Sequence, residues 1–417
     1  MLTFLLVLFI LLSTLNLSTL FGDSTFVGGV PLMTWISYVL YILLIVLSIY
    51  FNLSKYWVEP RKYDVIQLVL LFTGLLSVAY SLLIGISWRT VLFGSIHYFL
   101  PFLLSGPIFY VSDRSIVVLK RTIHISIILC GVIALLFFTG ILNLIATSDI
   151  SRLYRSSTII DGGLGLVGVA LALQYILNGN EKYGKLRYVL LIAGVLIVAS
   201  GMSRARIVAL FLIVILSLLF HMAWSESKIG RFYKILVFVA IAAFVVMLLF
   251  PGFFSSFYNT VFSRFESLGN DNSTIFRVEE RRLQLDYFMK NPIFGVGWGG
   301  LSNATVTDLR GVAQKIANHN MFTSVLAGGG LIFAIPYFLW LGSMLFNESR
   351  QLKEDPYART NVLLLLSILI MSWGSAGFAK YSMVIAMMIV YINMRERREN
   401  ADAGKQNDWD PDLPQAD

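Results

Sequence analysis

A histidine followed by an asparagine, His319-Asn320, and several paired arginines are the residues of this sequence best suited to chemistry. A histidine can take a proton from a hydroxyl group near neutral pH, so His319 is a candidate general base. Arginine binds phosphate oxygens through two parallel hydrogen bonds, which the point charge of lysine does not match. Together these residues predict chemistry on a phosphorylated ligand.

The arginines of interest stand in three pairs along the chain. They are Arg152 with Arg155, Arg204 with Arg206, and Arg277 with Arg281. The last pair lies in a segment that is predicted to be a helix from about 275 to 290, ended by Asn291-Pro292. Cations in the first turn of a helix oppose its dipole unless an anion is bound there. The alternative is a solvated surface helix in which Glu279 and Glu280 neutralise the arginines.

A glycine-rich turn over residues 294–300 follows the predicted helix, and its backbone could approach a ligand closely. No strand-helix-strand pattern surrounds this turn, so it is not a dinucleotide fingerprint. The run Gly328-Gly329-Gly330 lies in a later apolar segment and predicts close contact between helices. Helix packing is the expected role of the remaining histidines, His97, His124 and His221.

The elements that must position these residues are long and apolar. Of the 417 residues 57% are hydrophobic and 13% are charged, whereas a soluble domain is roughly 45–50% apolar and 25% charged. Twelve segments are expected to cross a bilayer as helices. They are 2–20, 33–52, 65–84, 91–111, 122–145, 162–178, 188–201, 205–224, 234–250, 320–346, 360–376 and 380–394. The predicted fold class is an all-α polytopic membrane protein.

The connections between these segments differ in charge. Alternate connections hold three or more lysines and arginines, and the intervening short ones hold two or fewer. By the positive-inside rule both termini are then cytoplasmic. We therefore expect one integral membrane domain over residues 1–417, with residues 251–318 as a large periplasmic loop or lid. Residues 396–417 are expected to form a disordered cytoplasmic tail.

Several classes of function are disfavoured by composition. The single cysteine, Cys130, excludes an intramolecular disulfide and cysteine-based metal sites. The net charge of +8 arises from basic residues scattered among short connections, which favours contact with a lipid bilayer over nucleic acid. The outward segments contain no Asp-x-Asp pair, so neither a metal nor a cofactor is expected. The segments also lack acidic or basic residues near their midpoints, which disfavours a coupled transporter.

Three short motifs follow one another along the chain. They are Ser203-Arg204-Ala205, Arg277 with its helix and Pro292-Ile293-Phe294-Gly295-Val296-Gly297, and His319-Asn320. Together, over roughly residues 150–345, they resemble the O-antigen polymerase and O-antigen ligase superfamily, the Wzy and WaaL type. The resemblance implies a GT-C-like fold and a glycosyltransferase that uses polyprenyl diphosphate sugars. It also implies that Arg204 and Arg277 bind the diphosphate and that His319 engages the acceptor hydroxyl, so these three are the predicted catalytic residues.

The remaining site candidates are predicted to bind substrate. They are Arg152, Arg155, Arg206, Arg281 and Asn320. Two departures from the family pattern lie near them. Asp161-Gly162-Gly163 stands where family members often have Pro-Asn, and Arg281 stands where they often have an aromatic residue.

The residues and the resemblance converge on glycosyl transfer from a polyprenyl diphosphate. Within the superfamily we expect a polymerase that joins oligosaccharide repeat units carried on undecaprenyl diphosphate, because the sequence around the motifs diverges from the more regular ligase pattern. The reaction is expected at the outer face of the bacterial cytoplasmic membrane, without a metal. The expected partners are the lipid-linked donor and acceptor, the bilayer and a chain-length regulator. The alternatives are an O-antigen ligase that transfers the polymer to lipid A core, a flippase or other transporter of lipid-linked oligosaccharide, and a structural scaffold.

Overall fold

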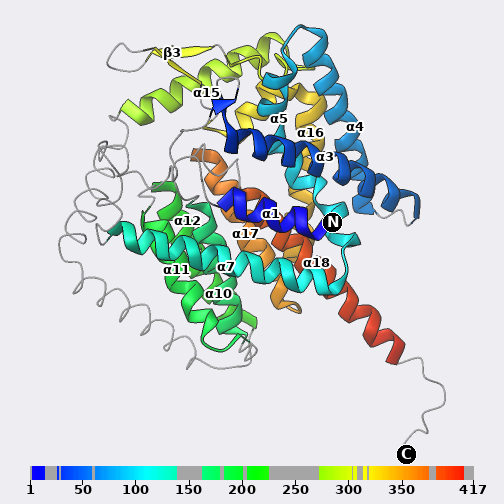
Figure 1. Ribbon diagram of the computed structural model, residues 1–417, viewed down its shortest axis with the longest axis vertical. Helices are drawn as coiled ribbons and strands as arrows, with labels where there is room; N and C mark the ends of the chain where they lie inside the picture. The colour runs from blue at the N-terminus through cyan, green and yellow to red at the C-terminus, as the bar shows by residue number, and fades with distance from the viewer. Residues whose placement is uncertain are drawn as a thin grey trace, which may run out of the picture.

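The elements are almost all helices. The computed structural model of the protein describes residues 2–14, 26–27, 30–58, 62–138, 162–178, 183–200, 204–224, 272–302, 304–307, 313–316, 319–374 and 382–407. Most of the elements are labelled in Figure 1. In chain order they are α1 (Leu2–Thr14), β1 (Phe26–Val27), β2 (Val30–Pro31), α3 (Leu32–Val58), α4 (Lys62–Leu83), α5 (Trp88–Leu103), α6 (Ser105–Tyr110), α7 (Asp113–Phe138), α10 (Gly163–Leu177), α11 (Leu186–Ser200), α12 (Arg204–Trp224), α15 (Asn272–Lys290), β3 (Thr305–Thr307), β4 (Ala313–Lys315), α16 (Met321–Arg350), α17 (Pro356–Gly374) and α18 (Ser382–Asn407). The strands form two antiparallel pairs, β1 with β2 and β3 with β4.

Several of these helices have the length and composition needed to cross a membrane. Within the described residues five do so, namely Val65–Leu83, Asp113–Leu136, Ala205–Ala223, Met321–Arg350 and Pro356–Trp373. Shorter apolar helices cover Leu2–Leu12, Ile42–Ser54, Gly163–Leu177 and Leu186–Ser200. The protein is an all-α, multi-pass membrane protein. The count of twelve spans stays a prediction, and the span expected at 234–250 lies outside the described residues.

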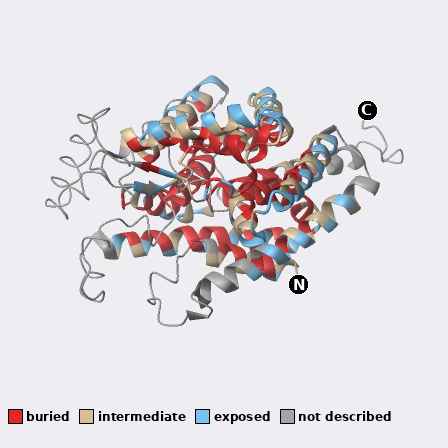
Figure 2. Ribbon diagram, turned by 90° about the horizontal axis from the view of Figure 1, so that it is seen from above, coloured by how far each residue is buried: buried red, intermediate tan, exposed pale blue. Residues whose placement is uncertain are grey.

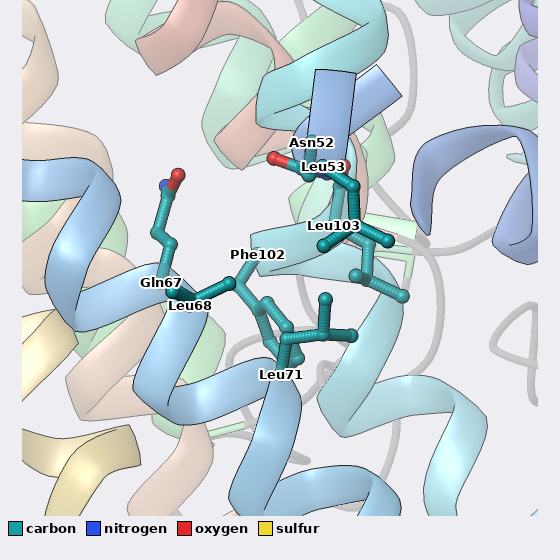
Figure 3. A pocket seen from close by; sticks show the side chains of 7 residues that line it. All are labelled: Asn52, Leu53, Gln67, Leu68, Leu71, Phe102 and Leu103. Atoms are coloured by element: carbon teal, nitrogen blue, oxygen red, sulfur yellow. Dashed lines mark hydrogen bonds between the residues drawn. The ribbon is translucent and has the colours of Figure 1, made fainter. Parts of the chain in front are cut away.

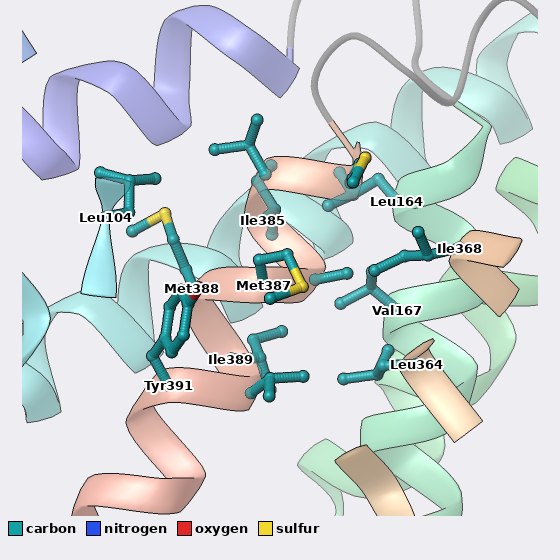
Figure 4. Packing of buried hydrophobic residues seen from close by; sticks show 14 of the residues in the cluster. Leu104, Leu164, Val167, Leu364, Ile368, Ile385, Met387, Met388, Ile389 and Tyr391 are labelled. Atoms are coloured by element: carbon teal, nitrogen blue, oxygen red, sulfur yellow. The ribbon is translucent and has the colours of Figure 1, made fainter. Parts of the chain in front are cut away.

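The first part of α18 lies in the middle of the apolar core. Its residues from Met383 to Ile392 are buried on all sides, which is the pattern of a helix surrounded by other helices. Figure 4 shows Ile385 and Ile389 of α18 together with Val167 of α10 and Leu364 of α17. Burial is concentrated along the inner faces of the helices, and exposed residues lie on the outside (Figure 2).

The segment 91–111, predicted to be one span, is instead two helices, α5 and α6. Pro107 has no N–H to donate to the carbonyl oxygen of Leu103, so an unbroken helix would leave that oxygen unpaired. Nδ2 of Asn52 in α3 donates to it at 2.6 Å, and the amide oxygen of Asn52 accepts from Ser105 at 3.0 Å. Figure 3 shows these α3 and α5 residues around a cavity of about 20 Å³, which holds about one water and no substrate.

The helix α16 is broken at Gly330, where φ is 61° and ψ is −171°. The turn that follows α15 docks into this break through its backbone. The N–H of Leu331 donates to the oxygen of Pro292, and the N–H of Val296 donates to the oxygen of Ala327, both at 2.8 Å. The break therefore exists because a neighbouring loop replaces hydrogen bonds that the helix would make with itself.

The glycines of this region serve contacts within the protein. A Cβ on Gly299 would lie 2.7 Å from the backbone oxygen of Thr90 in α5, so this turn approaches protein backbone rather than the ligand that the sequence suggested. The buried ring of Trp298 lies against Gly328 and Gly329, where a Cβ would come within 3.0 and 2.9 Å of it. The nearest neighbours of these two glycines thus include the ring of a loop residue, and the predicted contact with another helix stays a prediction.

The tail predicted to be disordered from residue 396 begins as a helix. The helix α18 continues to Asn407. Lys120 Nζ pairs with Glu396 at 2.5 Å, and Nη2 of Arg397 pairs with Oε1 of Glu348 at 2.6 Å. The polar composition of the segment predicts disorder, but ion pairs to residues far away in the sequence stabilise its first turns. Residues 408–417 lie outside the described part of the chain.

Candidate functional site

His319 is held by a buried carboxylate. It lies two residues before the start of α16, and its Nδ1 lies 2.6 Å from Oε2 of Glu280 in α15, a residue that is 1% exposed. The backbone N–H of His319 points to the other oxygen of Glu280 at 3.4 Å. Because a carboxylate only accepts hydrogen bonds, Nδ1 is the donor and the lone pair of Nε2 is left to accept a proton. The pair has the arrangement of an oriented general base.

A second set of polar contacts ties the start of α16 to α15. Oδ1 of Asn320 accepts from the N–H of Thr323 at 3.0 Å and so caps α16. The buried side chain of Gln284 donates to Oγ of Ser324 at 3.1 Å and accepts from the hydroxyl of Thr323. Gln284 lies four residues after Glu280, so both occupy the same face of α15. That face fixes the position of the histidine.

Two residues predicted to bind substrate hold the end of a third helix. Nη2 of Arg281 and Nδ2 of Asn320 both donate to the backbone oxygen of Trp373, each at 3.0 Å, near the end of α17. The last carbonyls of a helix have no partner within the helix, so these donors stabilise its end. Both side chains therefore make contacts within the protein. Direct contact of either one with a substrate stays a prediction.

Arg277 belongs to the same junction of α15 and α16. It lies one helical turn before Glu280 and is half-buried. The ring of its neighbour Phe276 is buried and contacts the imidazole of His319 edge to face, with 5.9 Å between ring centroids. The structure therefore brings together His319 and the α15 arginines that the sequence predicted for one site.

The other predicted arginines are placed less completely. Arg204 begins α12, its side chain lies outside the described part, and Arg152 and Arg155 lie outside it entirely. Arg206 is buried, and its guanidinium covers Gly162 at the start of α10, where a Cβ would come within 2.3 Å of Nη1. This contact gives a physical reason for the departure from the family pattern at that glycine, because any side chain there would displace the arginine.

The starts of α10 and α12 share a side of the molecule with the His319 junction. A cavity of about 20 Å³ is lined by the final turns of α10 and α12 and the first turns of α17, through Gln174, Leu177, Asn178, Ser217, Phe220, His221, Pro356, Arg359, Thr360 and Leu363. The helices α10 and α12 thus run parallel to each other and antiparallel to α17. The end of α12 meets the start of α17 at this cavity, and the two helices have similar lengths of 21 and 19 residues. Arg204 and Arg206 at the start of α12 therefore lie near the level of Trp373 at the end of α17, which contacts Arg281.

Residues 188–338 match the protein family described as O-antigen ligase. The match includes Arg204, Arg277 and His319, and with them α15, the glycine-rich turn and the first part of α16. This segment belongs to the O-antigen ligase and polymerase superfamily. The resemblance inferred from the three motifs is therefore confirmed. No curated protein gives a match to the chain.

A larger cavity, of about 200 Å³, lies at the other end of the helices and outside the superfamily segment. Its lining residues are Lys120, Gln174, Tyr175, Asn178, Tyr183, Pro356, Tyr357 and Asn393, all of them outside the matched range. Tyr357 and Trp373 lie near opposite ends of α17, which are roughly 24 Å apart at the rise of a helix. We therefore place the candidate site at the α15–α16 junction, where the base and the arginines meet.

Glu280 is the residue of the superfamily segment that sequence reasoning missed. The sequence offers it only the alternative role of neutralising neighbouring arginines, together with Glu279. The structure separates the two acids, because Glu280 is buried against His319 whereas Glu279 is exposed. The available signal was its spacing of four residues from Gln284, which places two hydrogen-bonding side chains on the face of α15 that is turned toward α16.

Proposed function

We propose that the protein is a glycosyltransferase that joins oligosaccharide repeat units carried on undecaprenyl diphosphate. The observation that carries this proposal is the His319–Glu280 pair beside Arg277, within a segment of the O-antigen ligase and polymerase superfamily. A base of fixed orientation suits the activation of a hydroxyl group, and guanidinium groups suit a diphosphate. Both are chemical needs of transfer from a lipid-linked sugar.

The proposed reaction is a single displacement at the anomeric carbon of the donor. The acceptor hydroxyl attacks this carbon and gives its proton to Nε2 of His319, while Glu280 stabilises the imidazolium that forms. A new C–O glycosidic bond forms as the bond between the anomeric carbon and the diphosphate oxygen breaks. Arg277 and Arg204 stabilise the charge of the departing lipid diphosphate. The proton then passes from His319 to water.

The reaction is proposed for the outer face of the bacterial cytoplasmic membrane, with both termini in the cytoplasm. The positive-inside pattern of the connections supports this orientation. The ion pairs of Lys120 and Arg397 also support it, because they lie at the end of the helices opposite His319. A chain-length regulator remains an expected partner.

The proposed reaction needs no metal, because diphosphate is a good leaving group and the arginines take the role that a metal plays elsewhere. Within the described residues no group of three or more His, Cys, Asp or Glu could hold a metal ion. We expect transfer to proceed at an unchanged rate in EDTA. Loss of activity in EDTA that is restored by magnesium would contradict this expectation.

A polymerase and a ligase differ in their acceptor, and the family description favours the ligase as the second candidate. The test uses the purified protein in liposomes with a lipid-linked repeat unit, with and without lipid A core. Chain extension without core supports the polymerase, and product that forms only with core supports the ligase. His319→Ala is expected to lower the transfer rate by roughly 10²–10⁴-fold in either case, while binding of the lipid-linked donor persists. Movement of the donor across the bilayer with no new glycosidic bond would point to a transporter instead.

A further inference from the structure

The outward face of α15 carries a stripe of exposed apolar side chains. Val278, Leu285 and Met289 are 53%, 41% and 72% exposed. They are separated by seven and four residues, so they lie above one another along the helix. Arg282 is exposed on the same stripe. This face points away from the side of α15 that holds His319.

Among the described side chains of α15, the remaining exposed positions are polar and lie to one side of the stripe. They are Glu279, Asp286 and Lys290. At about 100° per residue they are rotated by roughly 80–120° from Val278, whereas Leu285 and Met289 lie within about 20° of it. The helix therefore has three sectors: one toward the protein, one apolar and one polar. An apolar sector next to a polar one suits a helix that lies at the boundary between lipid and water.

The position of α15 relative to the membrane follows from its contacts. Gln284 is hydrogen-bonded to Ser324 in the first turn of α16, which is long and apolar enough to span a bilayer. In Figure 1, α15 runs across the end of the molecule at which α16 begins. The helix therefore lies at the depth where the hydrocarbon region ends.

Two exposed tryptophans at the same end mark this depth independently. Trp373, at the end of α17, is 60% exposed, and the guanidinium of Arg281 lies 5.6 Å from its ring centroid. Trp88, which begins α5 beside the glycine-rich turn, is 56% exposed and has Arg89 at 5.5 Å from its ring. An exposed tryptophan next to a cation is typical of the interface between lipid and water, where the ring meets acyl chains and the cation meets phosphate.

We propose that α15 lies in the headgroup region of the leaflet next to His319, with Val278, Leu285 and Met289 in contact with acyl chains. Arg282, on the same stripe, binds the phosphate of a surrounding phospholipid, and this charge complementarity favours lipid over an apolar protein partner. The segment predicted to be a lid is then anchored in the bilayer. This location of α15 in the headgroup region goes beyond the proposed reaction and does not depend on it.

The test places a fluorescent probe on each exposed sector of the full-length protein in phospholipid vesicles. Cys130, which is buried, is replaced by alanine, and single cysteines are introduced by Met289→Cys and Leu285→Cys on the apolar stripe and Glu279→Cys on the polar sector. Each is labelled with nitrobenzoxadiazole. Quenching is then compared between vesicles that contain lipids with a nitroxide near the headgroup end of the chain and vesicles in buffered iodide.

Labels at positions 289 and 285 are expected to be quenched several-fold more by the nitroxide lipid than by iodide, and the label at 279 is expected to show the reverse. Equal access of iodide to all three positions would overturn the proposal in favour of a helix in water. Protection of positions 289 and 285 from both quenchers would overturn it in favour of a protein partner or a second copy. None of these outcomes depends on transferase activity, so this location of α15 and the proposed function can fail separately.

Discussion

At the scale of single residues, the two partners Glu280 and His319 differ in their exposure to solvent. The carboxylate is 1% exposed, whereas the imidazole side chain is 22% exposed. A substrate can therefore reach the histidine but not the glutamate. This division gives Glu280 a positioning role, since it holds the ring and the Nδ1 proton while Nε2 performs the transfer.

Replacement of Glu280 tests this division. Glu280→Gln keeps a group that can accept from Nδ1 but removes the negative charge that stabilises the imidazolium. We expect the transfer rate to fall by about 10²-fold or more, the scale on which general base catalysis operates. Steady-state rates in proteoliposomes measure the change.

The matched control for that variant is Glu279→Gln, on the exposed neighbour, which should keep the wild-type rate. In a His319→Ala background the Glu280→Gln change should add no further loss, because residues that act as a unit are not additive. A full additional loss in the double variant would show that Glu280 acts elsewhere.

At the scale of elements, the break in α16 determines where the histidine lies. The part of α16 before Gly330 is joined by backbone hydrogen bonds to the turn after α15, and the rest of the helix continues past the break. The short outer part of α16 and α15 thus form one unit. A substitution at Gly330 that opposes the break should therefore disturb the site, although residue 330 makes no contact with His319 itself.

Gly330→Ala is predicted to destabilise the protein. A Cβ there would lie 2.2 Å from the backbone oxygen of Ile293. The φ of 61° is also one that residues other than glycine rarely adopt. The strained backbone alone costs about 1–3 kcal/mol of the free energy of unfolding. Thermal unfolding in detergent, followed together with transfer activity, measures this effect.

A second glycine of the same helix provides the control for that substitution. A Cβ on Gly342 meets nothing within 4 Å, and Gly342→Ala should be neutral or stabilise by up to about 1 kcal/mol. An equal loss of stability in both variants would mean that the break at Gly330 has no special role.

The elements themselves could largely be predicted from sequence, whereas their breaks could not. Runs of about 20 apolar residues predict helices because a bilayer leaves the backbone few alternatives. The break before Ser105 depends on Asn52 of another helix, and the break at Gly330 depends on the turn after α15. Such contacts between distant residues leave no periodic signal in the chain. The same reason explains the error over residues 396–407, whose helix is stabilised by ion pairs to α7 and α16.

At the scale of the whole molecule, the charged groups far from His319 hold the last helix in place. Burial opposes the charge of Arg397, but the hydrogen bonds and charges of Glu348 and Asp355 outweigh it and raise the pKa of the guanidinium above its ordinary value. Because the pKa of Arg397 is higher in the folded protein than in the unfolded chain, its ionisation stabilises the folded state fully at any pH below the ordinary arginine pKa. The contact therefore persists at every physiological pH and is not a pH switch.

Arg397→Gln is predicted to loosen the end of α18. It leaves the buried carboxylate of Glu348 without this cation, and breaking such a pair costs about 3–5 kcal/mol. Protease should then cut within residues 396–407 faster than in the wild type. The control is Glu399→Gln, which removes a carboxylate that is 46% exposed and pairs with Arg395 four residues before it; such a pair on a helix is worth only about 0.3–0.5 kcal/mol. Equal cutting rates in wild type and Arg397→Gln would contradict the predicted anchoring.

The candidate site was predictable in its residue types but not in its pairing. The motifs locate Arg277 and His319, because arginine and histidine are chemically distinctive and stand in a recognisable order. The partner of His319 could not be read from the chain, since Glu280 lies 39 residues away and beside an equally acidic neighbour. Only the burial of one face of α15 separates the two acids.

The broken form of α16 has a consequence for the response of the protein to its bilayer. A continuous spanning helix transmits a change of tilt along its whole length when membrane thickness changes. In this protein the segment next to His319 is joined to α15 and to the glycine-rich turn, above a break at Gly330. Tilting of the long part of α16 can therefore be absorbed at the break. The distance between His319 and Glu280 should stay constant in thick and thin membranes.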